Sequence, residues 1–222
     1  MFTGLVQHVG TVMGIEPSAA GRVLTIDAGT WPDRAPSDGA STVPALALGE
    51  SIAVSGCCLT LVSVANPSMG PSLGPSLGST LLSFDVIHQT LRVTALGRCE
   101  VGTRVNLERS ATPLTLLGGH IVQGHVDGLG RVAATGNREG EWRLRIELPP
   151  ELMRYAHPKG SISIDGVSLT VADLEDGGNT VDVCLIPETL ARTTLGERIV
   201  GDSVQLEMDC LAKMLARLVE RR

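Results

Sequence analysis

With 222 residues, 43% of them hydrophobic and 19% charged, the chain is long enough for one large domain or two small ones and too apolar to be disordered. Its formal net charge of -6 at pH 7, with no cluster of Lys and Arg, disfavours a nucleic-acid partner. No apolar run approaches the ~20 residues that span a membrane, and the N-terminus has no basic leader, so we expect neither a membrane segment nor a signal peptide.

The cysteines indicate a reducing compartment. There are five, an odd number, and Cys57 and Cys58 are adjacent. A secreted disulfide framework uses an even number of spaced cysteines, whereas free thiols persist in the cytoplasm. We therefore expect a cytoplasmic protein.

An internal repeat organises the chain. Residues 4–12 match residues 124–132 at 4 of 9 positions, residues 51–61 match 161–171 at 5 of 11, and residues 86–108 match 185–207 at 11 of 23. Three blocks in the same order indicate that one module has been duplicated. The first copy carries ten extra residues before Ser51 and eleven before Val86. The second insertion is a Pro/Ser/Gly loop at 67–79, for which the sequence indicates no function.

Each copy predicts short strands separated by turns. Segments rich in Val, Ile and Thr alternate with period two, which is typical of half-buried strands, at 51–54, 58–64, 81–87, 104–108, 144–148 and 168–174. Each copy also predicts one short helix that ends at a glycine, over 88–97 and 187–196. The pattern indicates an all-β fold of two barrels in tandem. Their cores must be aliphatic, because aromatic residues make up only 2% of the chain.

A longer helix is predicted over residues 208–222. It places Leu211, Met214, Leu215 and Leu218 on one face. This face either packs back on its own barrel or associates with copies of itself. The narrow apolar stripe favours self-association.

The second block of the repeat carries the first candidate chemistry. Cys58 and Thr60 share one face of a predicted strand, and Ser168 and Thr170 share the equivalent face in the second copy. A small buried residue beside an ordinary strand threonine is the plain structural reading. Retention of a thiol or hydroxyl at the same place in both copies favours a functional one.

Other chemistry-bearing residues lie outside that block. His120 and His125 are five residues apart and face opposite sides of a strand, which disfavours a shared metal ion and leaves an acid–base role open for one of them. Lys159 reads as a solvated cation, Asp165 as part of a hairpin turn, and Asp209 as a helix cap. Phosphate-binding and dinucleotide-binding glycine motifs are missing from the sequence, which disfavours enzymes of those classes.

Taken together, these residues resemble the riboflavin synthase family over essentially the whole chain. The resemblance rests on MFTGLV at the N-terminus, GCCLT at 56–60, GGHIVQGHVD at 118–127, IDGVSLT at 164–170 and IPETLARTTLG at 186–196. It implies two six-stranded Greek-key barrels, over residues 1–111 and 112–207, and an oligomerisation helix over 208–222. The residues 88–89 are His-Gln where many members have Lys-Glu.

The resemblance also implies an activity. Two molecules of 6,7-dimethyl-8-ribityllumazine undergo dismutation by transfer of a four-carbon unit, giving riboflavin and 5-amino-6-(D-ribitylamino)uracil, with no cofactor and no metal. Each barrel binds one lumazine, and the working site forms between the N-terminal barrel of one subunit and the C-terminal barrel of its neighbour in a homotrimer. Lumazine synthase is a further candidate partner.

Site residues carry over by position. The expected catalytic residues are Cys58, His125, Ser168, Thr170 and Asp209. The expected substrate contacts of the N-terminal barrel are Gly4, Leu5, Val6, Cys58, Leu59, Thr60, Asp85, Val86, Ile87, His88, Gln89 and Thr90. Those of the C-terminal barrel are Gly124, His125, Val126, Lys159, Ser168, Leu169, Thr170, Ile186, Pro187, Glu188, Thr189, Leu190 and Ala191.

Three rival functions remain. A non-catalytic lumazine-binding protein on the same duplicated barrel is the nearest, but such a relative keeps one pocket and loses the other. The flavin-binding barrel of a reductase would need a following nicotinamide-binding domain. A purely structural barrel would not explain paired polar motifs at equivalent positions.

Overall fold

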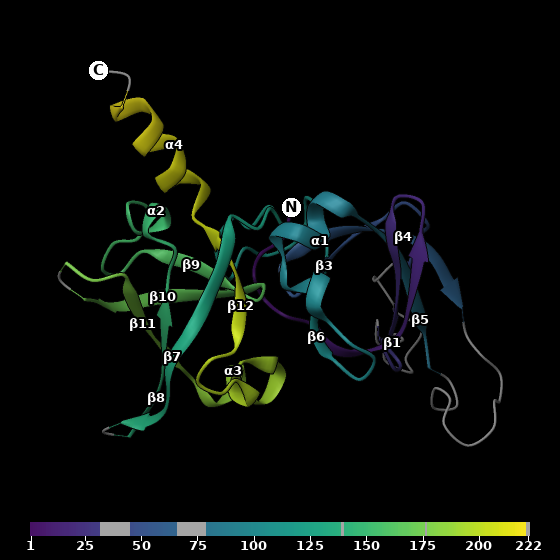
Figure 1. Ribbon diagram of the computed structural model, residues 1–222, viewed down its shortest axis with the longest axis horizontal. Coiled ribbons are helices and arrows are strands. Elements are labelled where there is room, and N and C mark those ends of the chain that lie inside the picture. Colours follow the sequence, from purple (N-terminus) through teal and green to yellow (C-terminus); the bar gives the residue numbers. More distant parts are fainter. Residues whose placement is uncertain (32–44, 66–78, 139, 176, 221–222) are drawn as a thin grey trace.

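The computed structural model describes residues 1–31, 45–65, 79–138, 140–175 and 177–220. Two β-barrels lie side by side along the long axis of the molecule, and a C-terminal helix projects from the second barrel (Figure 1). The two insertions expected in the first copy fall mostly on residues 32–44 and 66–78, which lie outside the described residues.

The described residues of the N-terminal half form a closed antiparallel barrel in the order β1-β2-β5-β4-β3-β6. Because β6 returns beside β3 while β3, β4 and β5 run in sequence, the topology is a Greek key. After β5 comes the helix α1, then a 3₁₀ turn, η1. The bounds are β1 His8–Ser18, β2 Gly21–Asp27, β3 Ser51–Val54, β4 Cys57–Ala65, β5 Leu81–Ile87, α1 His88–Val93, η1 Ala95–Arg98 and β6 Arg104–Arg109.

The second half repeats this barrel strand for strand, in the closed order β10-β11-β8-β7-β12-β9. The predicted all-β duplication is therefore confirmed. The bounds are β7 Gly128–Arg138, β8 Glu141–Glu147, α2 Pro150–Met153, β9 Ser161–Ile164, β10 Val167–Leu174, β11 Thr180–Leu185, α3 Pro187–Arg192, η2 Thr194–Glu197, β12 Ser203–Met208 and α4 Cys210–Val219.

Alternation along the strands builds two separate aliphatic cores. In β5, Leu82, Phe84 and Val86 are buried, and the residues between them face outward. The same period of two is visible in β8, where Leu144 and Ile146 are fully buried. Because the faces alternate, each barrel keeps a continuous set of outward side chains that can form a surface site.

The two short helices end earlier than their glycines predict. α1 stops at Val93 because Thr94 adopts an extended backbone, and the Thr94 side chain then accepts a hydrogen bond from the Leu96 N–H to start η1. The equivalent Thr193 does the same before η2. A threonine cap, rather than a C-terminal glycine, therefore ends each helix.

The hairpin turns β3–β4 and β9–β10 meet at the centre of the molecule. Ser55-Gly56 and Asp165-Gly166 have positive φ, as tight hairpin turns require. A Cβ on Gly56 would lie 2.6 Å from the Gly166 nitrogen, so the turns touch backbone to backbone. The barrels are also joined by Asn106, whose side chain donates to the Asp165 carbonyl over 2.8 Å.

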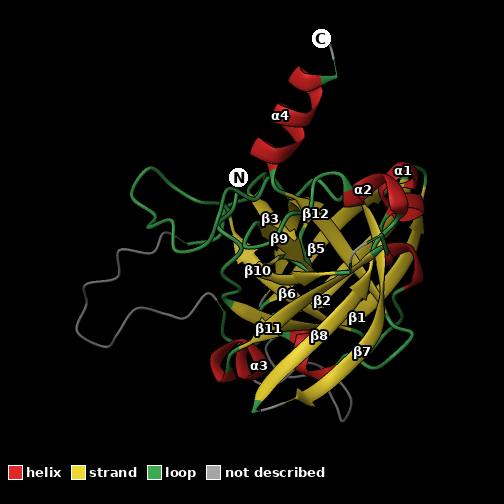
Figure 2. Ribbon diagram, turned by 90° about the vertical axis from the view of Figure 1, so that its left-hand side faces the viewer, coloured by secondary structure: helices red, strands yellow, loops and turns green. Residues whose placement is uncertain are grey.

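Helix α4 begins two residues later than predicted, after Asp209, whose side chain caps it by accepting the Leu211 N–H at 2.9 Å. It points away from both barrels (Figure 2). The large apolar residues of its exposed face are Leu211, Met214, Leu215, Leu218 and Val219, and they are 57–73% exposed. This apolar face therefore does not fold back on its own barrel. Among the described residues, no helix is long and apolar enough to cross a membrane.

Candidate functional site

One outward face on each barrel gathers the predicted polar residues. On the N-terminal barrel, the half-buried Cys58 and the exposed Thr60 of β4 lie on the outer side, as do Asp85 and Ile87 of β5. We call these four residues the N-face. Ile87 is 52% exposed, so the N-face also presents an apolar side chain.

The C-terminal barrel has a matching surface, which we call the C-face, made of Ser168 and Thr170 of β10 and Ile186 at the end of β11. Ser168 is half-buried, Thr170 is exposed, and Ile186 is 63% exposed. Each face thus offers a thiol or hydroxyl, a threonine and an exposed isoleucine. This combination suits a flat ligand with polar edges.

The loops that precede β1 and β7 are exchanged between the barrels. The Gly4 carbonyl accepts the Ser168 N–H at 2.8 Å, and the Gly124 carbonyl accepts the Cys58 N–H at 2.9 Å. Accordingly Val6 packs against the core of the C-terminal barrel, whereas Val126 packs against that of the N-terminal barrel. The expected grouping of residues 4–6 with Cys58, and of residues 124–126 with Ser168, is therefore wrong. Each segment borders the face of the other barrel.

Glycine is required where the exchanged loops approach the faces. Gly4 has φ +74° and Gly124 has φ +80°, a region that side chains disfavour. A Cβ on Gly4 would lie 2.6 Å from the Cβ of Ser168, and one on Gly124 would lie 2.6 Å from the Cβ of Cys58. These contacts explain why the same glycine occurs in both copies.

Two buried glutamates hold the exchanged loops. The Glu108 carboxylate on β6 accepts the backbone N–H of Thr3 at 2.7 Å and of Gly4 at 3.0 Å, and the Thr3 hydroxyl at 2.7 Å. The equivalent Glu207 on β12 accepts the N–H groups of residues 123, 124 and 125 at 2.7, 2.9 and 3.1 Å. Burial raises the pKa of both carboxyls, and the backbone donors partly oppose this.

His120 contacts the C-face, and His125 does not. His120 Nδ1 lies 2.7 Å from the Ser168 hydroxyl. Burial lowers the pKa of His120, with Asp209 partly opposing this, so the imidazole is neutral at pH 7. The expected role of His125 beside Ser168 is therefore not supported, because His125 is exposed and its backbone N–H bonds Glu207.

The adjacent cysteines have different environments. Cys57 is buried in the N-terminal core, and burial raises its pKa to about 12. Cys58 alternates to the outer face and is half-buried. Of the two, only Cys58 can therefore present sulfur to a ligand.

The remaining expected contacts divide into three groups. Leu59, Val86 and Leu169 are core residues, so only their backbone atoms can face a ligand. On the short helices, Thr90, Thr189 and Leu190 are half-buried, while Gln89, Pro187, Glu188 and Ala191 are exposed. Leu5 is 47% exposed, and Lys159 is exposed with a left-handed backbone.

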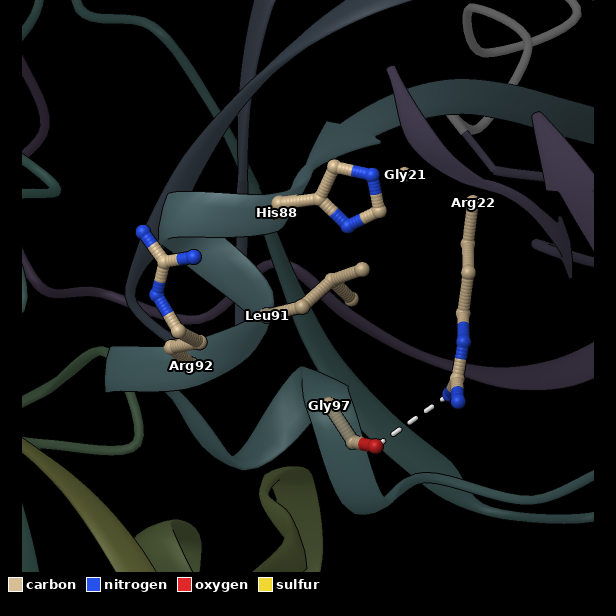
Figure 3. A pocket seen from close by; sticks show the side chains of 6 residues that line it. All are labelled: Gly21, Arg22, His88, Leu91, Arg92 and Gly97. Carbon is tan, nitrogen blue, oxygen red and sulfur yellow. Dashed lines mark hydrogen bonds between the residues drawn. The ribbon is translucent and has the colours of Figure 1, made fainter. Parts of the chain in front are cut away.

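His88 lines a different cavity from the N-face. This cavity, of about 400 Å³, lies at the end of the N-terminal barrel and is bordered by Gly21, Arg22, His88, Leu91, Arg92 and Gly97. Figure 3 shows His88 and Leu91 facing Arg22, whose guanidinium donates to the Gly97 carbonyl over 3.2 Å. Arg22 has the inward alternation of Leu24 and Ile26, whereas Cys58 and Thr60 face outward. The Arg22 side chain of this cavity therefore lies on the opposite side of the sheet from the N-face.

No metal centre is formed by the described residues, in which no three His, Cys, Asp or Glu side chains are grouped to hold an ion.

Sequence reasoning missed Glu108 and Glu207, and it did not foresee the contact between His120 and Ser168. The glutamates carry a signal, since both end the third matching block, in RVNLE and SVQLE. His120 has no counterpart in the first copy, so the repeat could not identify it.

Comparisons with known proteins agree with this architecture. The model of the lumazine binding domain family matches twice, over residues 3–110 and 123–209. The chain is 41% identical to riboflavin synthase of Mycobacterium tuberculosis (strain ATCC 25618 / H37Rv) over 227 residues, covering 99% of this chain and 98% of that protein. It is 30% identical to riboflavin synthase of Bacillus subtilis (strain 168), covering 100% and 91%.

Solved structures show the same fold. A crystal structure of LumP complexed with riboflavin superimposes with a TM-score of 0.70 at 24% identity, covering 94% of this chain and 99% of that one. LumP complexed with 6,7-dimethyl-8-(1'-D-ribityl) lumazine gives a TM-score of 0.69 at 23% identity, with the same coverage. With the domain matched twice and the relatives matched over nearly their whole length, the chain belongs to the riboflavin synthase family.

Proposed function

We propose that the protein is a riboflavin synthase, a transferase that converts two molecules of 6,7-dimethyl-8-ribityllumazine into riboflavin and 5-amino-6-(D-ribitylamino)uracil. The observation that carries this proposal is the pair of equivalent faces that carry different reactive side chains. A reaction between two copies of one compound needs two similar binding faces, which hold the reactants together and lower the entropic barrier. Donor and acceptor must also be treated differently, and Cys58 on one face stands where Ser168 and His120 stand on the other.

The C-face is suited to proton transfer. The 7-methyl group of the lumazine is acidic because its carbanion delocalises into the ring, so a base must remove a proton from it. A neutral His120 can take the hydroxyl proton of Ser168 as Ser168 removes one from the substrate. Asp209 favours the charged form of His120 and therefore stabilises the imidazolium that results.

The N-face is suited to binding the partner molecule. Cys58 supplies a thiol for hydrogen bonding or for addition to the ring, and Thr60 and Asp85 supply polar atoms toward the ribityl chain. Residues 124–126 border this face, as residues 4–6 border the C-face. Thr170, Lys159 and the first turns of α1 and α3 complete the two proposed pockets.

Each face is open on a single chain, which supports a site between subunits. Ile87 and Ile186 are 52% and 63% exposed, and a second molecule must cover them to exclude water from the reaction. The exposed apolar residues of α4 provide a surface for self-association. We therefore propose a cytoplasmic homotrimer whose sites form between the N-face of one subunit and the C-face of the next, with lumazine synthase as a candidate partner. The proposed division of the chain is 1–111, 112–207 and 208–222.

A direct assay tests the activity. Purified protein is mixed with 6,7-dimethyl-8-ribityllumazine, and riboflavin formation is followed by its absorbance. Ser168→Ala and Cys58→Ser should each lower kcat at least about 100-fold if these groups transfer protons or add to the ring. Binding of the lumazine without turnover by the wild-type protein would instead identify a non-catalytic lumazine-binding protein.

Mixing two inactive variants tests the site between subunits. Ser168→Ala lacks only a working C-face, and Cys58→Ser lacks only a working N-face. When the two are unfolded together and refolded, about one quarter of the inter-subunit contacts pair two intact faces by random assortment. Activity should then return to that fraction of the wild-type value. No recovery would show that both faces must come from the same chain.

A further inference from the structure

The buried carboxylates of Glu108 and Glu207 have no direct contact with a ligand-binding face. Glu108 is 4% exposed and Glu207 is 3% exposed. Each carboxylate accepts hydrogen bonds from three donors of an exchanged loop, at distances of 2.7–3.1 Å. The hydrogen bonds of both carboxylates therefore reach the faces through those loops.

The connection from Glu207 leads to the N-face. Its carboxylate accepts the Gly124 N–H at 2.9 Å, and the Gly124 carbonyl accepts the Cys58 N–H at 2.9 Å. The same loop is in van der Waals contact with the Cys58 side chain at Gly124. A carboxylate of the C-terminal barrel thus sets the surroundings of the thiol on the N-terminal barrel.

The connection from Glu108 leads the opposite way. Its carboxylate accepts the Gly4 N–H at 3.0 Å, and the Gly4 carbonyl accepts the Ser168 N–H at 2.8 Å. The Thr3 carbonyl also lies against Gly119, where a Cβ would meet it at 2.1 Å, and Gly119 directly precedes His120. A carboxylate of the N-terminal barrel thus sets the surroundings of Ser168 and His120.

A glutamine cannot replace either carboxylate. An ionised carboxylate offers only acceptors, whereas an amide has one acceptor oxygen and an NH₂ group that would face a backbone N–H. At Glu207 one oxygen accepts residue 123 and the other accepts residues 124 and 125. Glutamine would therefore leave at least one buried N–H without an acceptor, which loosens the loop.

We infer that Glu108 and Glu207 are positioning residues with crossed effects: Glu108 orders the C-face and Glu207 orders the N-face. For activity, this inference rests on the proposed riboflavin synthase function. The ordering of each face can be measured without any turnover, so the two can fail separately.

The experiment compares Glu207→Gln with Glu108→Gln in the full-length protein. The first readout is the rate of Cys58 alkylation by iodoacetamide, followed by mass spectrometry, with the half-buried Cys184 of β11 as an internal standard. The second is the pH titration of His120 by NMR of its imidazole. Glu207→Gln should raise the Cys58 rate at least about fivefold and leave the His120 titration unchanged. Glu108→Gln should shift the His120 titration and change the Cys58 rate less than about twofold.

The other possible outcomes also decide whether the inference holds. An uncrossed pattern, equal effects of both variants on both readouts, or no effect at all would overturn it. If a glutamine variant fails to fold, the corresponding Asp variant keeps the charge and only retracts it by one methylene, and it must show the same crossed pattern at smaller size. If the variants show the crossed pattern but the wild-type protein forms no riboflavin, the proposed function is refuted and the positioning role stands.

Discussion

The contact between the two hairpin turns makes a quantitative prediction about how the barrels are joined. Gly56 has φ +83°, and a Cβ there would lie 2.6 Å from the Gly166 nitrogen, which is backbone and cannot move aside easily. Gly49 has almost the same φ, +84°, but nothing within 4 Å of its Cβ position. The two glycines therefore separate backbone strain from steric collision.

The expected magnitudes follow from this difference. Gly49→Ala should cost only the left-handed backbone term, about 1–2 kcal/mol of unfolding free energy. Gly56→Ala should cost that amount plus the displacement of one turn from the other, an overpacking term of about 1–3 kcal/mol. The predicted difference between the variants is therefore about 1–3 kcal/mol.

Urea unfolding measures both values, with a fluorescent probe in each barrel to detect separate transitions. If the turns hold the barrels together, Gly56→Ala should also separate the transitions of the two barrels, whereas Gly49→Ala should not. Equal free energies for the two variants would show that the turns can part at no cost, and would refute the assignment of this contact as a rigid junction.

Three further outcomes are expected. His120→Gln should lower kcat at least about tenfold, whereas His125→Gln should stay within about threefold; the reverse order, measured by riboflavin absorbance, would restore His125 as the catalytic histidine. Leu215→Glu should shift the sedimentation of the protein toward the monomer, because it places a charge on the exposed apolar face of α4, and an unchanged oligomer would contradict the role of that helix. Arg145 lowers the pKa of Asp182, so this pair stabilises the protein above the ordinary Asp pKa and the effect is lost as pH falls through the lowered one. Asp182→Asn should therefore destabilise the protein at pH 7 and by less as the pH falls below the ordinary Asp pKa, and a deficit that does not shrink with falling pH in thermal unfolding would contradict the linkage.

The strands and the two faces were predictable from local patterns. A strand places alternate residues on opposite sides, so Cys58 with Thr60, and Ser168 with Thr170, had to share a face wherever the strands lay. The repeat then implied that the faces are equivalent, and the six expected strands all occur, although the segment expected at 144–148 ends at Glu147. These conclusions depend only on residues that lie close together in the sequence.

Which loops and side chains border each face was decided by the tertiary structure alone. Whether the Gly4 loop borders its own barrel or the other depends on hydrogen bonds between residues more than 100 positions apart, which no local pattern contains. The same holds for His120, which reaches Ser168 across 48 residues of sequence, whereas His125 aligns with Leu5 in the repeat and its backbone N–H bonds Glu207. The sequence by itself determined two like barrels with like faces. The exchange of loops decided which residues complete each face, because the Gly4 and Gly124 carbonyls find their donors, the Ser168 and Cys58 N–H groups, on the other barrel.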